Sequence, residues 1–190
     1  KTTTIKMLST LILPTDGEIK ISGLDIIKDR QKIKEILNVS PQETAIAPNL
    51  TVKENLDFMA GVYQIPNREE KIKELIKMFK LEEVLNQKAK TLSGGWQRKV
   101  SIAISLINEP KILFLDEPTL GLDVIARKEL WSVIKKLKGK ITIILTTHYM
   151  EEAESLSDRI GIMAKGALTD TGTSEELITK TNAKNFEDAL

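Results

Sequence analysis

Residues 111–118 read KILFLDEP, an apolar run that ends in two carboxylates and a proline. A run this rich in Ile, Leu and Phe is typical of a strand that is covered on both faces of a parallel sheet. A second apolar run at Ile141–Thr146 follows a helical pattern at Val124–Leu137. This order predicts a β-α-β unit, with both strands central in the sheet. A shorter strand is expected at Glu18–Ile21.

The stretch between Pro48 and Val100 has a purely helical pattern. Apolar residues recur with the helical period at Val52–Tyr63 and Arg68–Phe79, and a third such pattern begins at Gly95 and ends near Ile107. We therefore predict an all-helical lobe at roughly residues 43–101, inserted into an α/β core that carries a mostly parallel sheet. The whole chain, residues 1–190, is expected to be one domain.

The composition excludes several classes of function. Lys and Arg number 28 against 27 for Asp and Glu, so the chain lacks the positive charge of a nucleic-acid-binding protein, and we expect no nucleic acid partner. It has no cysteine and one histidine, which argues against disulfides and against an all-protein zinc site. No apolar run approaches the roughly 20 residues that span a bilayer. Any membrane role is expected to come through a partner.

Asp116 and Glu117 end the first predicted strand, and ligands bind beyond the carboxyl ends of strands in open parallel sheets. Asp116 can hold Mg²⁺, usually through water. Glu117, which points to the other face, can polarise the water that attacks a γ-phosphorus. A strand that runs into a solvated acidic turn would have the same sequence, so the alternative stays open at this point.

The first residues, Lys1, Thr2 and Thr3, precede a helical pattern and match the end of a phosphate-binding loop, G-x-x-x-x-G-K-[ST]. In a complete loop the lysine contacts the β- and γ-phosphates and the Thr2 hydroxyl ligates Mg²⁺. An ordinary exposed N-terminus is the alternative. The chain has no initiator methionine, and residues 185–190 read as an unfinished amphipathic segment, so we expect a fragment. Because an anion site needs the whole cradle of backbone N–H groups and not its terminal lysine alone, we expect this fragment to be inactive by itself.

A second helix start carries Ser93, Gly94 and Gly95. Backbone N–H groups, a hydroxyl and the helix dipole together form an anion site that a phosphate can approach closely. A plain N-cap is the alternative.

The interpretation of three further residues depends on their position in the sequence. His148 follows the strand at Ile141–Thr146, so a parallel sheet would bring it to the edge of Asp116, where an imidazole can bond a γ-phosphate oxygen or orient water. A lone histidine is more often structural. Gln42 alone is uninformative, and Asp123 reads as the N-cap of the helix that follows it.

Together these signals have the order and spacing of one family, and the chain resembles the ATP-binding cassette (ABC) ATPases along essentially its whole length. The resemblance assigns Lys1, Thr2 and Thr3 to the Walker A loop and residues 92–96, Leu-Ser-Gly-Gly-Trp, to the signature motif. It further identifies Gln42 as the Q-loop glutamine, Asp116 and Glu117 as the Walker B aspartate and catalytic glutamate, Asp123 as the D-loop aspartate, and His148 as the switch histidine.

The family implies a P-loop NTPase fold with ATP and Mg²⁺ as cofactors. It places Glu117, His148 and Gln42 in catalysis and Thr2, Gln42 and Asp116 around the metal. The remaining nucleotide contacts fall on Lys1, Thr3, Ser93, Gly94, Gly95 and Asp123.

Trp96 departs from the commonest signature, which has glutamine there. Bulky apolar residues at this position are familiar in cassettes of ABC-2-type exporters, and the following Gln-Arg-Lys and the ending at Asn185–Ala189 are similar to that branch. A second departure is the lack of the loop glycines and of the aromatic residue that stacks on adenine.

The resemblance implies an exporter subunit on the cytoplasmic face of the cell membrane. It hydrolyses MgATP in a head-to-tail dimer with a second nucleotide-binding subunit, and transmembrane subunits complete the transporter.

Three rivals remain. A DNA-repair ABC ATPase would need a long coiled-coil insertion, for which the interval from Gln42 to Leu92 has no room. A soluble translation factor normally carries two cassettes in one chain. A non-enzymatic binding module would not need Glu117 and His148.

Overall fold

The computed structural model describes residues 1–188. The described chain forms two compact units, one of residues 2–145 and one of Lys1 together with the residues from Thr146 onward. None of the helices within residues 1–188 is both long and apolar enough to cross a membrane.

A three-stranded sheet forms the centre of the first unit, in the order β3 (Leu37–Ser40), β4 (Ile112–Asp116) and β5 (Thr142–Thr146). Strands β3 and β4 are parallel. Strand β4 has a neighbouring strand on each side, and four of its five residues are buried. Strand β5 stands at the edge of the described sheet, and Ile144 is 39% exposed. The expectation that both apolar strands are central is therefore wrong for β5.

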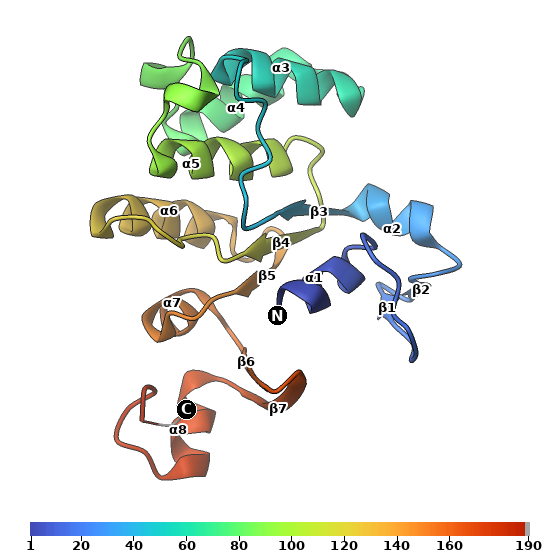
Figure 1. Ribbon diagram of the computed structural model, residues 1–190, viewed down its shortest axis with the longest axis vertical. Helices are drawn as coiled ribbons and strands as arrows, with labels where there is room; N and C mark the ends of the chain where they lie inside the picture. Colours follow the sequence, from blue (N-terminus) through green and yellow to red (C-terminus); the bar gives the residue numbers. More distant parts are fainter. Residues whose placement is uncertain (189–190) are drawn as a thin grey trace. The chain divides into compact units, whose positions relative to one another are not determined.

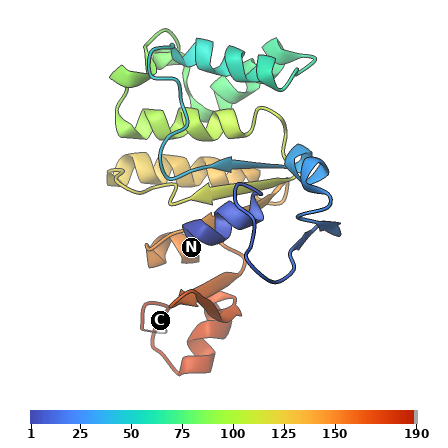
Figure 2. The same ribbon diagram turned by 45° about the vertical axis from the view of Figure 1, so that its right-hand side comes forward.

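Helices cover both faces of the β3–β4 pair. Helix α1 (Thr2–Leu8) contacts β4, and helix α5 (Gly94–Ser105) contacts β3 from the opposite side (Figures 1 and 2). Helix α2 (Arg30–Ile36) leads directly into β3. One apolar cluster joins α1, α2, β3 and β4, and it consists of Ile5, Ile26, Ile33, Leu37 and Phe114.

The predicted strand at Glu18–Ile21 is shorter in the structure. Strand β1 (Lys20–Ile21) pairs only with β2 (Leu24–Asp25), as an antiparallel hairpin. Its two-residue loop, Ser22 and Gly23, has positive φ at both positions, 51° and 80°. This is the conformation of the tight hairpin turn whose twist matches that of paired strands.

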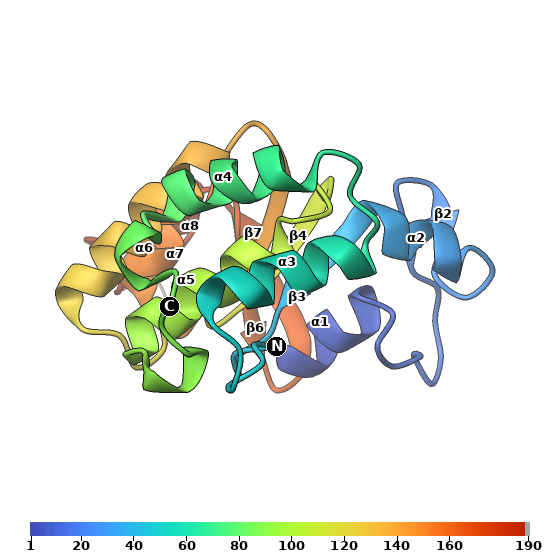
Figure 3. The same ribbon diagram turned by 90° about the horizontal axis from the view of Figure 1, so that it is seen from above.

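The middle of the chain is helical, as predicted. Helices α3 (Val52–Val62), α4 (Arg68–Phe79) and α5 contact one another, with two short 3₁₀ turns, η1 (Glu82–Val84) and η2 (Ala89–Thr91), between α4 and α5 (Figure 3). Thr51 and Glu54 form a capping box that fixes the start of α3. The boundaries of a separate lobe at residues 43–101 stay a prediction. Helix α6 (Val124–Leu137) follows β4.

The second unit contains α7 (Met150–Leu156), the antiparallel hairpin of β6 (Ile160–Ala164) and β7 (Ala167–Gly172), and α8 (Ser174–Thr181). Of the predicted amphipathic ending at residues 185–190, residues 186–188 form a turn with Phe186 buried. The last two residues, Ala189 and Leu190, lie outside the described part of the chain, so the ending as a whole stays a prediction.

Candidate functional site

Three predicted site residues meet at one edge of the sheet in the first unit. The parallel register sets Ser40 of β3 opposite Leu115 of β4. Both strands end at this level. Gln42 follows the end of β3 by two residues, and Asp116 and Glu117 lie at the end of β4. Asp116 is buried, only 3% exposed, whereas Gln42 is exposed. The strand-end carboxylates and the glutamine therefore come from two neighbouring strands at the edge where ligands bind in such sheets.

Glu117 has a strained backbone. Its φ is +50°, in the left-handed region that residues other than glycine seldom adopt. Such conformations cost on the order of 1–3 kcal/mol and cluster at functional sites. The carbonyl of Glu117 accepts a hydrogen bond from the N–H of Leu120 at 3.2 Å, which holds the turn.

Ser93 is the N-cap of helix α5. Its hydroxyl accepts from the N–H of Trp96 at 3.5 Å, which is long for a hydrogen bond. Ser93 and Gly94 are exposed, and Gly95 is half-buried. The first N–H groups of α5 therefore lie at an accessible helix start and are only weakly satisfied by the cap.

The two glycines of the predicted signature motif, Gly94 and Gly95, differ in their surroundings. A Cβ atom at Gly95 would lie 3.2 Å from the Cβ of Ala126, so this glycine lets α5 approach α6 closely. A Cβ at Gly94 would meet nothing within 4 Å, and neither glycine has positive φ. Glycine in a helix costs roughly 0.5–1 kcal/mol relative to alanine. Neither packing nor backbone conformation requires glycine at position 94, and the contact of Gly94 with a nucleotide stays a prediction.

Sequence reasoning missed Arg98, a side chain in the second turn of α5 that contacts the site. It is 5% exposed, and its Nη1 donates to the carbonyl of Pro41 at 2.6 Å while its Nη2 donates to the carbonyl of Gln42. Burial lowers the pKa of Arg98, and the nearby charge of Asp116 partly offsets this effect. Two adjacent cations, Arg98 and Lys99, in an otherwise uncharged helix were the available signal.

Asp123 caps helix α6, as its sequence position indicated. One carboxylate oxygen accepts from the N–H groups of Ile125 and Ala126, each at 2.9 Å. The preceding turn places Gly121 at φ +74°. This confirms the N-cap interpretation, and the nucleotide contact stays a prediction.

Helices α5 and α6 are also joined by charge. Lys99 Nζ bonds Glu129 Oε2 at 2.5 Å and lies 4.4 Å from the centroid of the Trp96 ring. The hydrogen bond from Lys99 and its charge lower the pKa of Glu129.

His148 belongs to the second unit, where it is exposed and its ring lies 4.1 Å from that of Tyr149, centroid to centroid. In the same unit Lys1 Nζ donates to the carbonyl of Thr147. Thr2 and Thr3 begin helix α1 of the first unit. The assignments of Lys1, Thr2, Thr3 and His148 to an ATP site stay predictions.

The donors at the sheet edge fit Mg²⁺. This ion keeps several waters and binds proteins through one or two carboxylates together with substrate phosphates. A buried strand-end carboxylate, Asp116, and the amide of Gln42 supply such a sparse oxygen set. Within residues 1–188 no group of three or more His, Cys, Asp or Glu residues could hold a metal by itself.

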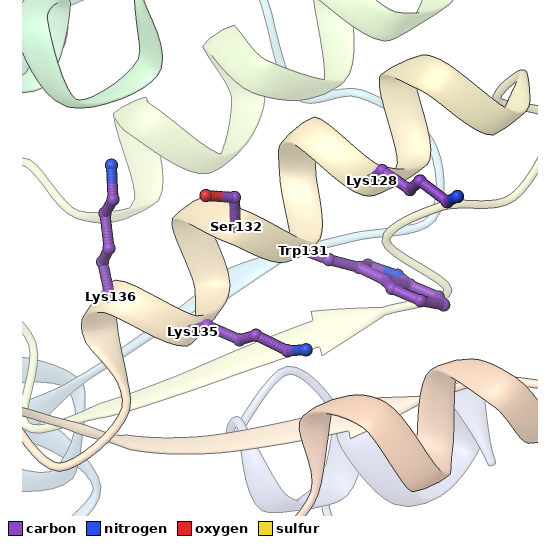
Figure 4. A pocket seen from close by; sticks show the side chains of 5 residues that line it. All are labelled: Lys128, Trp131, Ser132, Lys135 and Lys136. Carbon is purple, nitrogen blue, oxygen red and sulfur yellow. The ribbon is translucent and has the colours of Figure 1, made fainter.

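A separate depression of about 460 Å³ runs along α6, lined by Lys128, Trp131, Ser132, Lys135 and Lys136 (Figure 4). Lys128, Trp131 and Lys135 point to the same side of the helix. None of the predicted site residues lines this pocket, so it is not the ATP site that the sequence predicts.

Comparisons with known proteins agree with this arrangement. A family model described as "ABC transporter" matches residues 1–120. The chain is 44% identical over 176 residues to the human "Phospholipid-transporting ATPase ABCA3", which covers 92% of this chain and 10% of that protein. It is 38% identical over 180 residues to the Escherichia coli "Probable multidrug ABC transporter ATP-binding protein YbhF", covering 93% of this chain and 31% of the relative. The chain thus spans a minor part of the curated relatives it matches.

Two solved structures share the fold. One, described as "Structure of ATP binding subunit of ABC transporter", matches with a TM-score of 0.86 at 27% identity and covers 100% of this chain and 81% of that one. The other is a dimeric post-hydrolysis state of an ATP-binding cassette bound to ADP and Pi. It matches with a TM-score of 0.79 at 28% identity, and the match covers 90% of this chain and 79% of that one. The chain therefore belongs to the ABC transporter family, with the P-loop fold of that family's ATPases.

Proposed function

We propose that this chain binds and hydrolyses MgATP to power a membrane transporter. The observation that carries the proposal is the register of β3 and β4, which sets Gln42 level with Asp116 and Glu117 at the carboxyl edge of the sheet. The burial of Asp116 and the weakly capped start of α5 at Ser93 support it.

In this proposal each residue has a distinct task. Asp116, Thr2 and Gln42 would hold Mg²⁺, which when bound offsets the charge of the phosphates. Glu117 accepts a proton from the attacking water as the water oxygen bonds the γ-phosphorus and the bond to the β,γ-bridging oxygen breaks. Gln42 and His148 orient that water and the γ-phosphate. Lys1, Thr3, Ser93, Gly94, Gly95 and Asp123 bind the nucleotide.

We further infer a head-to-tail dimer in which the signature of one cassette closes over the ATP of another. One structural neighbour, a dimeric post-hydrolysis state of an ATP-binding cassette, supports a dimer. Transmembrane subunits would anchor the dimer peripherally at the cytoplasmic face of the cell membrane. Export is the proposed direction, supported by Trp96 in the signature and by the words "phospholipid-transporting" and "multidrug" in the names of two relatives.

The test is Glu117→Gln in the full-length protein. Removal of a positioned general base should lower steady-state phosphate release by about 10²–10⁴-fold while ATP still binds. MgATP should also raise the apparent mass of the variant in light scattering, because ATP that is not hydrolysed keeps the dimer closed. An unchanged mass would contradict the dimer.

Glu109→Gln is the matched control. Glu109 has nearly the same backbone conformation, φ +51°, but its carboxylate pairs with Lys71 on α4. It should keep wild-type turnover. Normal turnover of Glu117→Gln would remove Glu117 from the mechanism. If wild-type protein fails to hydrolyse ATP, the proposed function itself is wrong.

A further inference from the structure

Arg98 makes a contact that packing alone does not require. Its guanidinium is buried and donates to two consecutive carbonyls, those of Pro41 and Gln42. Burying a cation is costly unless its donors are satisfied. The planar fork of arginine can satisfy two carbonyls together, which the single ammonium of lysine does less well. The chain therefore uses a rigid double donor to hold the backbone at the Q-loop glutamine.

A second contact supports the same segment one turn along α5. The hydroxyl of Ser101 lies 3.3 Å from that of Ser40, and both serines are buried. Ser40 is the last residue of β3. Residues 98 and 101 lie on one face of the helix, since they are three positions apart. Helix α5 is thus bonded both to the end of β3 and to the two residues that follow it.

The positive charge of Arg98 also interacts with the negative charge of Asp116, the last residue of β4. One side chain of the signature helix therefore acts on both sides of the strand edge, through hydrogen bonds to Gln42 and through charge on Asp116.

We propose that Arg98 is a positioning residue that couples the signature helix to the metal side of the ATP site through the backbone of Gln42. Arg98 lies five residues beyond Ser93, or about 8 Å along the helix axis. A helix of this length moves as a rigid body. A phosphate that binds at the N-terminus of α5 and displaces the helix therefore also displaces the guanidinium of Arg98. The carbonyls of Pro41 and Gln42 follow it. This inference rests on the proposed ATPase function and adds a residue to it.

The experiment compares three variants of the full-length protein: Arg98→Lys, Arg98→Met and, as matched control, Lys99→Met. Arg98→Lys keeps the charge near Asp116 but cannot reproduce the fork. Lys99 is also a buried cation of α5, but it bonds Glu129 on α6 and does not contact the Q-loop. We would measure kcat, the KM for ATP, the Mg²⁺ concentration at half-maximal turnover and the thermal midpoint.

Arg98→Lys should lower kcat about tenfold and raise the half-saturating Mg²⁺ concentration about threefold or more, with a smaller change in KM. Arg98→Met should give at least the same loss of kcat. Lys99→Met should keep the wild-type Mg²⁺ dependence even where its thermal midpoint falls.

A purely structural role would lower the thermal midpoint of the Arg98 variants but leave kcat per folded molecule and the Mg²⁺ dependence unchanged. That result would overturn the inference while wild-type turnover upholds the proposed function. If Arg98→Met fails to fold, the kcat and Mg²⁺ dependence of Arg98→Lys distinguish the positioning role from a purely structural one. If the wild-type protein has no turnover, both the proposed function and this inference fall.

Discussion

Helices α5 and α6 both begin with an oxygen-bearing N-cap, yet the two caps differ. Asp123 gives α6 a full negative charge and two hydrogen bonds of 2.9 Å. Ser93 gives α5 a neutral hydroxyl and one contact of 3.5 Å. A helix start carries about half a positive charge and unsatisfied N–H groups. The start of α6 is neutralised by its own side chain, whereas that of α5 remains suited to an external anion.

The residues that follow the two N-caps also differ, since glycines follow Ser93 but not Asp123. The residues after Asp123 are the branched Val124 and Ile125, both exposed. Those after Ser93 are Gly94 and Gly95, and the space beside Gly94 is open. A phosphate could approach the backbone of α5 but would meet both side chains and a carboxylate at α6.

The largest expected effect comes from giving α5 the cap of α6. Ser93→Asp should lower ATP hydrolysis by the full-length protein by about 100-fold, because the carboxylate neutralises the helix start and repels a phosphate. The thermal midpoint should stay the same or rise, since aspartate is a good N-cap. Phosphate release and thermal unfolding measure the two effects.

Ser93→Asn is the matched control, because asparagine caps equally well without charge. It should stay within about tenfold of wild-type activity. Equal losses in both variants would mean that the serine hydroxyl, and not the neutral state of the cap, is what matters.

A smaller effect is expected from removing the cap of α6. Asp123→Ala leaves two N–H groups without their acceptor and should cost about 1 kcal/mol. For a domain of this size the thermal midpoint should fall by about 2–4 °C. Asp123→Asn should recover most of that loss. An unchanged midpoint for Asp123→Ala would show that α6 is held by its packing alone.

The smallest effect is expected from the ion pair of Lys99 and Glu129, which joins α5 and α6. The bond from Lys99 lowers the pKa of Glu129, so the pair stabilises the fold above the unfolded glutamate pKa of about 4.3. The stabilisation is lost as the pH falls through the lower folded pKa. The side chain of Glu129 is 48% exposed, so the contribution should be below about 1 kcal/mol.

The thermal midpoint of Glu129→Gln should therefore lie slightly below wild type at pH 7 and approach it at about pH 3. In a Lys99→Met background the same substitution should have no pH-dependent effect. A difference that persists in that background would assign the effect to something other than the pair.

The long periodic helices were predictable from sequence. The predicted ranges Arg68–Phe79 and Val124–Leu137 are the observed bounds of α4 and α6. Strand β3 was not predicted, because it is short and follows α2 without a break. Strand β7 was missed because most of its residues are exposed, and its conformation depends on pairing with β6. Pairing of this kind is tertiary information that local patterns do not contain.

The candidate site shows the same limit. The residue types at Asp116 and Glu117 pointed to phosphate chemistry, but the register that brings Gln42 level with them depends on β3. The positive φ of Glu117 has no sequence signature, because the surrounding structure enforces it. Arg98 was missed for a related reason, since its partners are backbone carbonyls about 57 positions away, and any residue type offers those.

The stacking of Lys99 on Trp96 gives the signature helix an optical probe of its own. An indole ring responds to a cation held over its face, and Lys99 Nζ lies 4.4 Å from the Trp96 centroid. The chain has two tryptophans, and the other, Trp131, is buried on α6. With Trp131 replaced by Phe, Trp96 would be the sole indole in these 190 residues, next to Gly95 at the helix start. Its emission would then follow the electrostatic environment of that helix start without any attached dye.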